Sequence, residues 1–410
     1  MALLKHVKEY DALRGLMALW VLLGHWASTV PIHNVLFQRR FFNEYAVDVF
    51  IILSGFAIAM LILAKQESYR AYITRRFFRI FPAYLFYLAV SVALAGWALD
   101  LWQAAPEGSM KEARVVIAQD SLSFIGAHTF FHLLGLHSLV PPALLPSSDF
   151  AFLGQAWSIS LEWQFYLIAP FVVALFTLPV SRTKAIVMAM AIAVIAALNP
   201  VMGFGFIGKF AVPFAVGIAT AFFLRARKEQ GRFAAQIPVG LTWLVLTGLC
   251  VLQGSLEFLP YCLWFAATAV ALSAHEQTSK VAGLLSAIAL TPPLQWLGKV
   301  SYSVYLSHML VLMGALSVLL PMGFGLWTFS LALLGATLVG TAVASALSYA
   351  LIEKPFQDLG KRLASSSAPQ ASESPQTTQP KPERKRILAA QEQTKDRDKE
   401  QDVLPVKKAG

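Results

Sequence analysis

Long apolar stretches of about 17 to 25 residues follow one another along most of this 410-residue chain, with only short polar segments between them. A stretch of this length crosses a hydrocarbon core of about 30 Å as an α-helix. We therefore predict an all-α polytopic membrane protein, a bundle of about ten transmembrane helices. The predicted spans are residues 12–30, 45–64, 77–97, 157–178, 184–200, 207–224, 239–253, 258–274, 298–319 and 327–352.

The composition agrees with a membrane location. Hydrophobic residues make up 57% of the chain and charged residues 14%, whereas soluble domains carry about 25% charged residues. The first apolar stretch has no small-residue cleavage site, so we expect it to remain as a membrane span. The net charge of +10 is explained by membrane orientation and requires no nucleic acid.

Charge predicts the orientation. With the N-terminus in the cytoplasm, most Lys and Arg residues fall on the cytoplasmic side. An even number of spans then places both termini in the cytoplasm. The basic residues expected on the opposite side are Arg39, Arg40, Lys111, Arg114 and Lys209.

The chain divides into a predicted transmembrane domain and a tail, and the domain contains one long loop. Residues 1–363 form the predicted transmembrane domain, and residues 364–410 are predicted to be a disordered, charged cytoplasmic tail because their Ser, Pro, Gln and Lys content cannot bury a core. Residues 98–156 form the only long loop, which is expected outside as a lid or an acceptor platform. Cys250 and Cys262 lie in apolar stretches and indicate no disulfide framework.

The first span carries two ionisable residues, Arg14 and His25. Eleven residues along a helix correspond to about three turns, so both side chains lie on nearly the same face, about 16 Å apart along the axis. Polar groups inside a membrane span are costly and usually mark a functional interior. We therefore expect His25 to be catalytic and Arg14 to lie nearer the cytoplasm.

Carboxylates in two other spans are candidate partners for His25. Asp48 lies in the apolar run VDVFIILSGF, with Ser54 beyond its middle, and Ser158, Glu162 and Tyr166 follow one another at intervals of four in WSISLEWQFY. Either acid can orient the histidine as the third member of a triad does. The alternative for each is a structural hydrogen bond between helices.

Basic residues cluster between the second and third spans in RRFFRIFPAY. Arg75, Arg76 and Arg79 have helical spacing and can bind phosphates, although ordinary positive-inside anchoring also explains such a cluster.

Near the C-terminal end of the predicted bundle, GKVSYSVYLSHML aligns Tyr305 and His308 as supporting candidates. The last span is expected to end at Glu353 and Lys354 as a helix terminus with a local ion pair.

Two motifs are interpreted as structural. GFGFIG at 203–208 matches a dinucleotide-binding pattern, but the strand that such a site requires is not predicted, so we expect a glycine-rich turn. His128, His132 and His137 have spacing that resembles a metal site, but they lie in an apolar stretch with no Cys or acid near them in sequence. We predict no metal.

Six motifs together resemble the acyltransferase 3 family of bacterial membrane acyltransferases that modify exported or surface carbohydrates. They occur in the family's order over about residues 7–360: RGLMALWVLLGH, VDVFIILSGF, RRFFRIFPAY, WSISLEWQFYLIAP, LGKVSYSVYLSH and LIEKPF. The resemblance assigns the family's essential Arg and His to Arg14 and His25, and its basic motif to Arg76 and Arg79. We expect Arg14 to bind the acyl donor together with Arg75, Arg76 and Arg79. One departure is Gln155, where relatives often have Asn before the Trp.

The resemblance implies a multi-pass protein of the bacterial inner membrane. It would transfer an acyl group, most simply acetyl, from cytoplasmic acyl-coenzyme A to a hydroxyl of a surface or exported carbohydrate or a lipid-linked glycan, with no tightly bound cofactor. Direct transfer and an acyl-histidine intermediate both remain open. The main alternative is a proton-coupled secondary transporter, which buried Arg, His, Asp and Glu would also suit. A membrane scaffold organised by the charged tail is a third possibility.

Overall fold

The computed structural model describes residues 7–31, 43–64, 67–177, 179, 181–230 and 257–366. The chain divides into two compact units, Met1–Ala368 and Pro369–Gly410, and all of these residues belong to the first. The described residues are helical with turns between the helices and contain no strand. The predicted all-α class is therefore confirmed.

Among the described residues of the N-terminal half, three long helices are followed by four short ones and then by another long helix. Their bounds are α1 Lys8–Ala27, α3 Asn43–Ala64, α4 Tyr69–Ala93, α5 Ala95–Ala104, α6 Lys111–Ser123, α7 Ile125–Leu133, η1 His137–Leu139 and α8 Trp157–Thr177. The long loop predicted at 98–156 therefore contains helices that are too short to cross a membrane.

The remaining helices follow α8 along the chain. Their bounds are α9 Arg182–Leu198, η2 Ile207–Phe210, α10 Ala211–Gln230, α12 Leu259–His275, α13 Lys280–Ala289, α14 Pro292–Leu319, η4 Leu320–Met322, α15 Leu326–Ser348, η5 Tyr349–Glu353 and α16 Lys354–Ser366. The first residues assigned to the tail thus continue α16, and the rest of the predicted tail lies outside the described residues.

Six segments among the described residues are long and apolar enough to cross a membrane. They are Asn43–Ala64, Tyr69–Ala93, Trp157–Thr177, Ile207–Ala226, Pro292–Met322 and Leu326–Ser365. The multi-pass architecture agrees with the sequence prediction. The count of about ten spans and the orientation of the termini stay predictions.

Four of the ten predicted spans are not among these six segments, for different reasons. The helix α1 contains charged residues, while α9 and α12 are each 17 residues long. The predicted span 239–253 lies outside the described residues. The hydrocarbon core requires about 17 to 25 residues, so the lengths of α9 and α12 fall at its lower limit.

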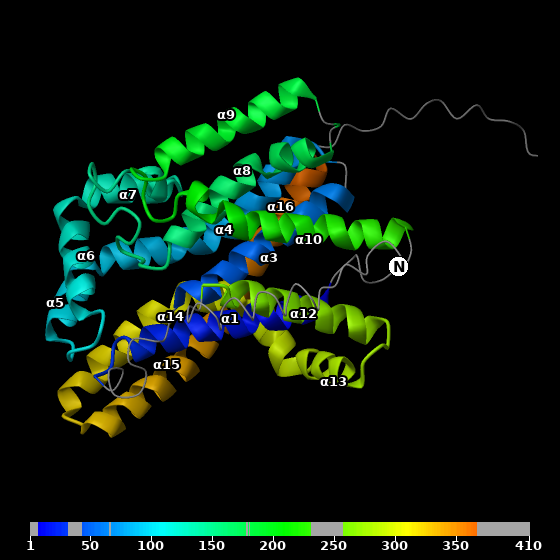
Figure 1. Ribbon diagram of the computed structural model, residues 1–410. Helices are drawn as coiled ribbons and strands as arrows, with labels where there is room; N and C mark the ends of the chain where they lie inside the picture. The colour runs from blue at the N-terminus through cyan, green and yellow to red at the C-terminus, as the bar shows by residue number, and fades with distance from the viewer. Residues whose placement is uncertain are drawn as a thin grey trace, which may run out of the picture. The chain divides into compact units, whose positions relative to one another are not determined.

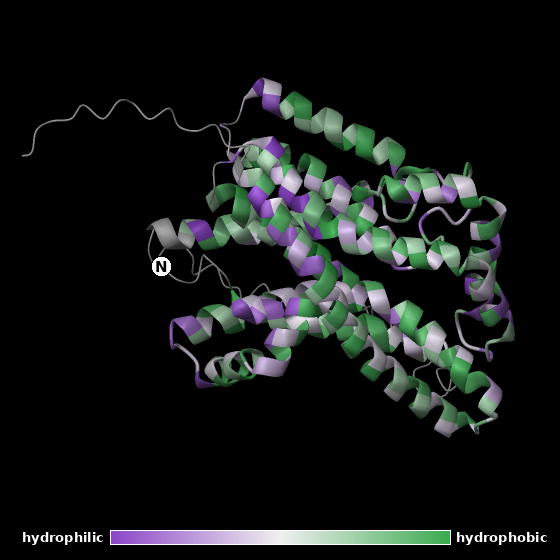
Figure 2. Cartoon of the chain, turned by 180° about the vertical axis from the view of Figure 1, so that it is seen from behind, coloured by the Kyte–Doolittle hydropathy of each residue, from purple (hydrophilic) through white to green (hydrophobic). Residues whose placement is uncertain are grey.

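Hydrophobic residues occur along most of the helices (Figure 2), and many of the large ones are exposed. The helix α9 has no buried residue. Its exposed side chains include Ile186, Met190 and Ile192. An exposed apolar surface of this extent fits contact with lipid.

The helices α1, α14 and α15 lie side by side, and α3 connects them to the rest of the bundle by packing against α1, α10, α12 and α8 (Figure 1). The helix α4 packs against α8, α14 and α16. Polar side chains from α1, α3, α4, α8 and α14 therefore meet inside the bundle.

Two glycines allow α1 and α14 to cross at very short range. A Cβ atom on Gly15 would lie 2.7 Å from the backbone nitrogen of Gly298, and one on Gly298 would lie 2.1 Å from the carbonyl oxygen of Asp11. Real Cβ atoms do not approach backbone this closely. Small residues at such crossings let membrane helices pack backbone against backbone.

The glycine-rich segment at 203–208 is a turn between α9 and α10, as predicted. The buried carboxylate of Asp149 accepts hydrogen bonds from the backbone nitrogens of Phe204, at 2.7 Å, and Gly205, at 2.9 Å. A Cβ on Gly203 would lie 2.6 Å from the same carboxylate. These glycines therefore hold an acid of the protein itself.

We predict that Gly298→Ala destabilises the fold, because the new methyl group meets the backbone of α1. Gly314 lies on the same helix, and a methyl group added to it would meet nothing within 4 Å. Gly314→Ala is therefore the matched control and should be neutral or stabilising by up to about 1 kcal/mol. Thermal unfolding of both variants in detergent provides the measurement. Equal melting temperatures would contradict the close crossing.

Candidate active site

Most of the predicted site residues line one of two cavities among the described helices. The smaller one, here called the arginine pocket, has a volume of about 150 Å³ and is lined by Arg14, Arg76 and Arg79 among others. The larger one, here called the His25 chamber, has a volume of about 700 Å³. Arg14 and His25 thus belong to different cavities, in agreement with their expected separation along α1.

Charge is concentrated in the arginine pocket. Its lining includes four cationic side chains and two carboxylates, which are Arg14, Arg76, Arg79, Lys299, Glu162 and Glu353. Arg76 also lies over the ring of Tyr166, with 5.7 Å between the guanidinium carbon and the ring centroid. A lining with excess positive charge suits an anionic ligand.

Glu162 is the centre of a hydrogen-bond network in this pocket. It accepts from the hydroxyl of Tyr166 one turn along α8 and, at 3.3 Å, from Ser54 of α3. The predicted polar stripe Ser158, Glu162 and Tyr166 therefore faces the bundle interior.

Arg75 lies outside the arginine pocket and forms an ion pair with Glu67. Arg75 and Arg76 are four and three residues from Arg79, so both have helical spacing with it. The ion pair with Glu67, and not helix phase, distinguishes Arg75 from the other two. Of the three arginines predicted to bind phosphate, the structure brings two together with Arg14.

Glu353 was expected at a helix terminus in an ion pair with Lys354, and the structure corrects this. The chain continues through a π-helical turn, Tyr349–Glu353, into α16. Glu353 is buried and accepts hydrogen bonds from Ser303, at 2.8 Å, and Gln357, at 3.0 Å. A π turn shifts the helix phase and occurs frequently at functional sites. It brings Glu353 into the arginine pocket.

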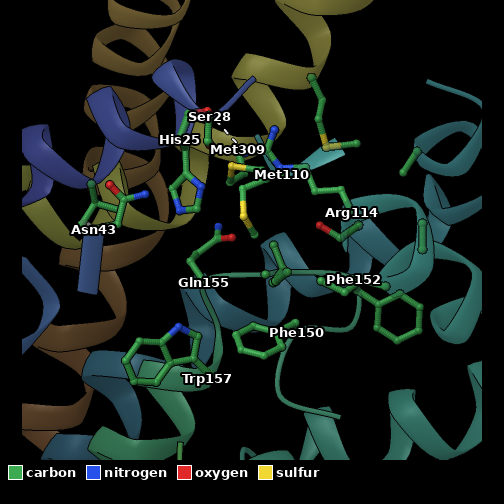
Figure 3. Close-up of a pocket in the computed structure, with 18 of the residues that line it drawn as sticks. His25, Ser28, Asn43, Met110, Arg114, Phe150, Phe152, Gln155, Trp157 and Met309 are labelled. Atoms are coloured by element: carbon green, nitrogen blue, oxygen red, sulfur yellow. Dashed lines mark hydrogen bonds between the residues drawn. The ribbon is translucent and has the colours of Figure 1, made fainter. Parts of the chain in front are cut away.

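His25 projects from the last turn of α1 into the larger chamber. Figure 3 shows it between Asn43 and Gln155, with Arg114 and Ser28 on another side and Trp157 and Phe150 farther away. The volume of the chamber lies in the range of about 300 to 1,000 Å³ that is usual for small-molecule sites.

His308 is the ring neighbour of His25. The two ring centroids are 5.2 Å apart, and His308 is only 1% exposed. Its Nδ1 lies 3.1 Å from the carbonyl oxygen of Val304, which assigns the proton to Nδ1, and its Nε2 has no hydrogen-bond partner. Because His308 lines neither cavity, it lies on the side of His25 that faces away from the chamber.

Neither predicted carboxylate partner contacts the ring of His25 among the described residues. Glu162 lines the other cavity, and Asp48 lines neither. The reason is helix phase: Val47 of α3 lines both cavities, and the next residue, Asp48, points about 100° away. In this structure His308 takes the place beside His25 that we expected for a carboxylate.

Tyr305 separates the two cavities and lines both of them. Its hydroxyl lies 3.0 Å from the carbonyl oxygen of Gln155, to which it donates, and 2.8 Å from the hydroxyl of Ser158. Tyr305, Ser158 and Gln155 form what we call the partition. The predicted supporting residues Ser158 and Tyr305 therefore lie between the arginine pocket and His25.

The three histidines that resemble a metal motif are packed in a different way. The rings of His132 and His137 stack face to face, with centroids 3.8 Å apart and planes inclined by 3°. Burial lowers the pKa of His132 to about 4. Within the described ranges no group of three His, Cys, Asp or Glu side chains has the geometry to hold a metal ion.

A family model for an acyltransferase domain, acyltransferase 3, matches residues 7–349. The chain belongs to the acyltransferase 3 family. It is therefore a membrane acyltransferase, as the six motifs indicate. The chain matches no curated protein and no solved structure.

Several residues that line these cavities were not predicted as site residues from the sequence. Arg114 and Asn43 line the His25 chamber, and Lys299 and Glu353 line the arginine pocket. Lys299 directly follows Gly298, the glycine at which α14 crosses α1. A cation next to such a glycine is the sequence signal that could have indicated that Lys299 lies inside the bundle. Arg114 carries no comparable signal because it belongs to a loop helix far from α1 in sequence.

Proposed function

We propose that this acyltransferase moves an acyl group, most simply acetyl, from acyl-coenzyme A to a hydroxyl of a carbohydrate. The acceptor would be a cell-surface or exported glycan, such as lipopolysaccharide O-antigen or exopolysaccharide, or a lipid-linked precursor, and the enzyme would lie in a bacterial inner membrane. The observation that carries the proposal is that a cationic pocket and a histidine chamber adjoin at Tyr305, whose hydroxyl lies between them, with Val47 also lining both.

The arginine pocket suits the donor. Guanidinium groups bind phosphate oxygens with paired, charge-assisted hydrogen bonds, and Arg76 and Arg79 lie on the side predicted to be cytoplasmic. A volume of about 150 Å³ is small for a nucleotide. We therefore place the phosphates at these arginines and only the slender pantetheine arm inside the pocket.

The thioester must then pass Tyr305 to reach His25. In the structure the hydroxyl groups of Tyr305 and Ser158 and the carbonyl of Gln155 close this path with hydrogen bonds. Rotation of the tyrosine side chain would join the two cavities. In this way a donor from one side could acylate an acceptor on the other while coenzyme A stays where it entered.

His25 would act as the general base. It takes the proton of the acceptor hydroxyl as the oxygen attacks the thioester carbonyl. The carbon–sulfur bond then breaks, and the thiolate of coenzyme A leaves and receives a proton. An acyl-histidine intermediate would also end with the same ester and the same free thiol.

His308 would position this base. With its own proton on Nδ1, its unprotonated Nε2 can accept a hydrogen bond from a ring N–H of His25 after a small movement of the rings. That bond would select the tautomer of His25 whose other nitrogen faces the chamber. A neutral imidazole here does part of what the aspartate does in a serine protease triad.

The first test is donor turnover. Purified protein in lipid nanodiscs should consume acetyl-coenzyme A and release free thiol, and His25→Ala should lower the rate at least 100-fold with the protein still folded. Wild-type activity in the purified His25→Ala variant would disprove the assignment. Substrate transport without thiol release would favour a transporter instead.

The donor site predicts a difference between two neighbouring arginines. Arg79→Gln should raise the KM for acetyl-coenzyme A about tenfold or more, because a charge-assisted bond contributes about 1.5 to 3 kcal/mol. Arg75→Gln is the matched control, because Arg75 pairs with Glu67 away from the pocket. The KM values are obtained from thiol release, and equal values for both variants would reject the donor site.

A positioning role for His308 predicts a specific kinetic pattern. His308→Ala should lower kcat 10-fold to 100-fold with little change in the KM for the donor, because substrate does not contact this residue. His308→Gln, which keeps an acceptor atom, should recover part of the loss. Equal rates in both variants, or a change confined to KM, would contradict the role.

A further inference from the structure

Arg114 is a buried cation in the same chamber as His25. It lies on α6, is 8% exposed, and lines the cavity across from the base (Figure 3). Burial lowers the pKa of its guanidinium to about 10, so the side chain remains charged at neutral pH. The chemistry proposed above uses no charge at this place.

Within the described part of the chain, the hydrogen bonds of Arg114 go to neutral groups. Its guanidinium donates to the hydroxyl of Thr29 at 2.7 Å, to the hydroxyl of Ser28 at 2.8 Å and to the carbonyl oxygen of His25 at 3.3 Å. It also lies over the ring of Trp102, 4.5 Å from the centroid. Among the described residues no carboxylate pairs with it.

A buried charge without a counter-ion is costly, and proteins usually pair such groups. Of the described residues that line the chamber, one is an acid, Glu44, which is exposed at the beginning of α3 and forms no ion pair with Arg114. The positive charge of Arg114 is therefore available to pair with an anionic group of a ligand in the chamber.

Two other polar groups in the chamber also lack partners. The amide oxygens of Asn43 and Gln155 are buried and accept no hydrogen bond from the described residues, and Gln155 is only 2% exposed. Both side chains flank His25 in Figure 3. Buried acceptors of this kind are normally satisfied, and the hydroxyl groups of a sugar would satisfy them.

We propose that the His25 chamber is the acceptor site and that Arg114 selects a carbohydrate that bears an anionic group, a carboxylate or a phosphate. Asn43 and Gln155 accept hydrogen bonds from the hydroxyls of the same sugar, which keeps the reacting hydroxyl beside His25. Trp102 and Trp157 provide aromatic surface in the lining. This inference rests on the proposed acyl transfer and specifies its acceptor class.

Arg114 also joins α6 to the end of α1, and the test must separate this structural role from selection. A residue that only supports the fold would affect neutral and anionic acceptors alike. A residue that selects charge changes the ratio between them. The informative quantity is therefore the ratio of kcat/KM for two probes that differ in charge.

The experiment uses the full chain in nanodiscs with acetyl-coenzyme A and four small probes. These are methyl β-glucuronide, glucose 6-phosphate, neutral methyl β-glucoside and cationic methyl glucosaminide. Ester formation is followed by mass spectrometry, and occupancy is followed by inhibition of thioester hydrolysis. The wild type should prefer an anionic probe over the neutral one at least tenfold and should disfavour the cationic one. The two anionic probes show whether the group is carboxylate or phosphate.

Arg114→Gln should reduce the anionic-to-neutral ratio below about threefold, whereas Arg114→Lys should keep a clear preference. Lys111→Gln removes a half-buried cation from the same helix, where it pairs with the exposed Glu107, and should leave the ratio unchanged. If Arg114→Gln does not fold, the wild-type ratios and Arg114→Lys decide the matter.

A wild type that shows no anion preference, in transfer or in inhibition, would overturn the proposal. So would an unchanged ratio in Arg114→Gln. A protein that releases no thiol with any probe would instead refute the acyl transfer on which the proposal rests, so the two failures are distinguishable.

Discussion

The close crossing of α1 and α14 is the contact on which the proposed active site depends. Gly15 and Gly298 remove the side chains that would hold the two helix axes apart. From that point, residues 15, 18, 22 and 25 advance along α1 by three, four and three, and residues 298, 301, 305 and 308 advance along α14 in the same way. Two parallel helices with this spacing stay in contact along one face. His25 and His308 therefore meet about 15 Å from the glycines.

The helix α3 determines which polar groups are available to each cavity. Its Val47 lines both cavities, and Ser54 lines the arginine pocket two turns farther along. The cations of α1, α4 and α14 gather on one side of the partition, and His25 lies on the other. The separation follows from the positions of these residues along their helices, since Arg14 lies in the first half of α1 and His25 in its last turn. Many large apolar side chains are exposed on the outside, so the polar interior is the natural place for the reaction.

The sequence predicts much of this arrangement because helical periodicity is local. The all-α class, the distance between Arg14 and His25, the shared face of Arg76 and Arg79 and the glycine-rich turn all follow from spacing within one segment. Contacts between distant segments do not follow from spacing. His308 meets His25 because of a glycine crossing that carries no polar signal, and Arg114 reaches the end of α1 from a loop helix.

Two expectations depended on an assumed helix phase. Asp48 is a carboxylate in an apolar run, yet the residue beside it is the one that faces the cavities. Glu353 enters the arginine pocket only because a π turn shifts the phase of the last helix, and single-residue propensities do not predict that turn.

The central proposal is that donor and acceptor enter from opposite sides of the membrane and meet at His25. It is tested most directly in proteoliposomes of defined orientation, with acetyl-coenzyme A only on the side of Arg76 and Arg79 and the acceptor only on the other. We expect acylated acceptor to accumulate on its own side while free coenzyme A stays on the donor side. Acylation only when both substrates share one compartment would contradict the proposal.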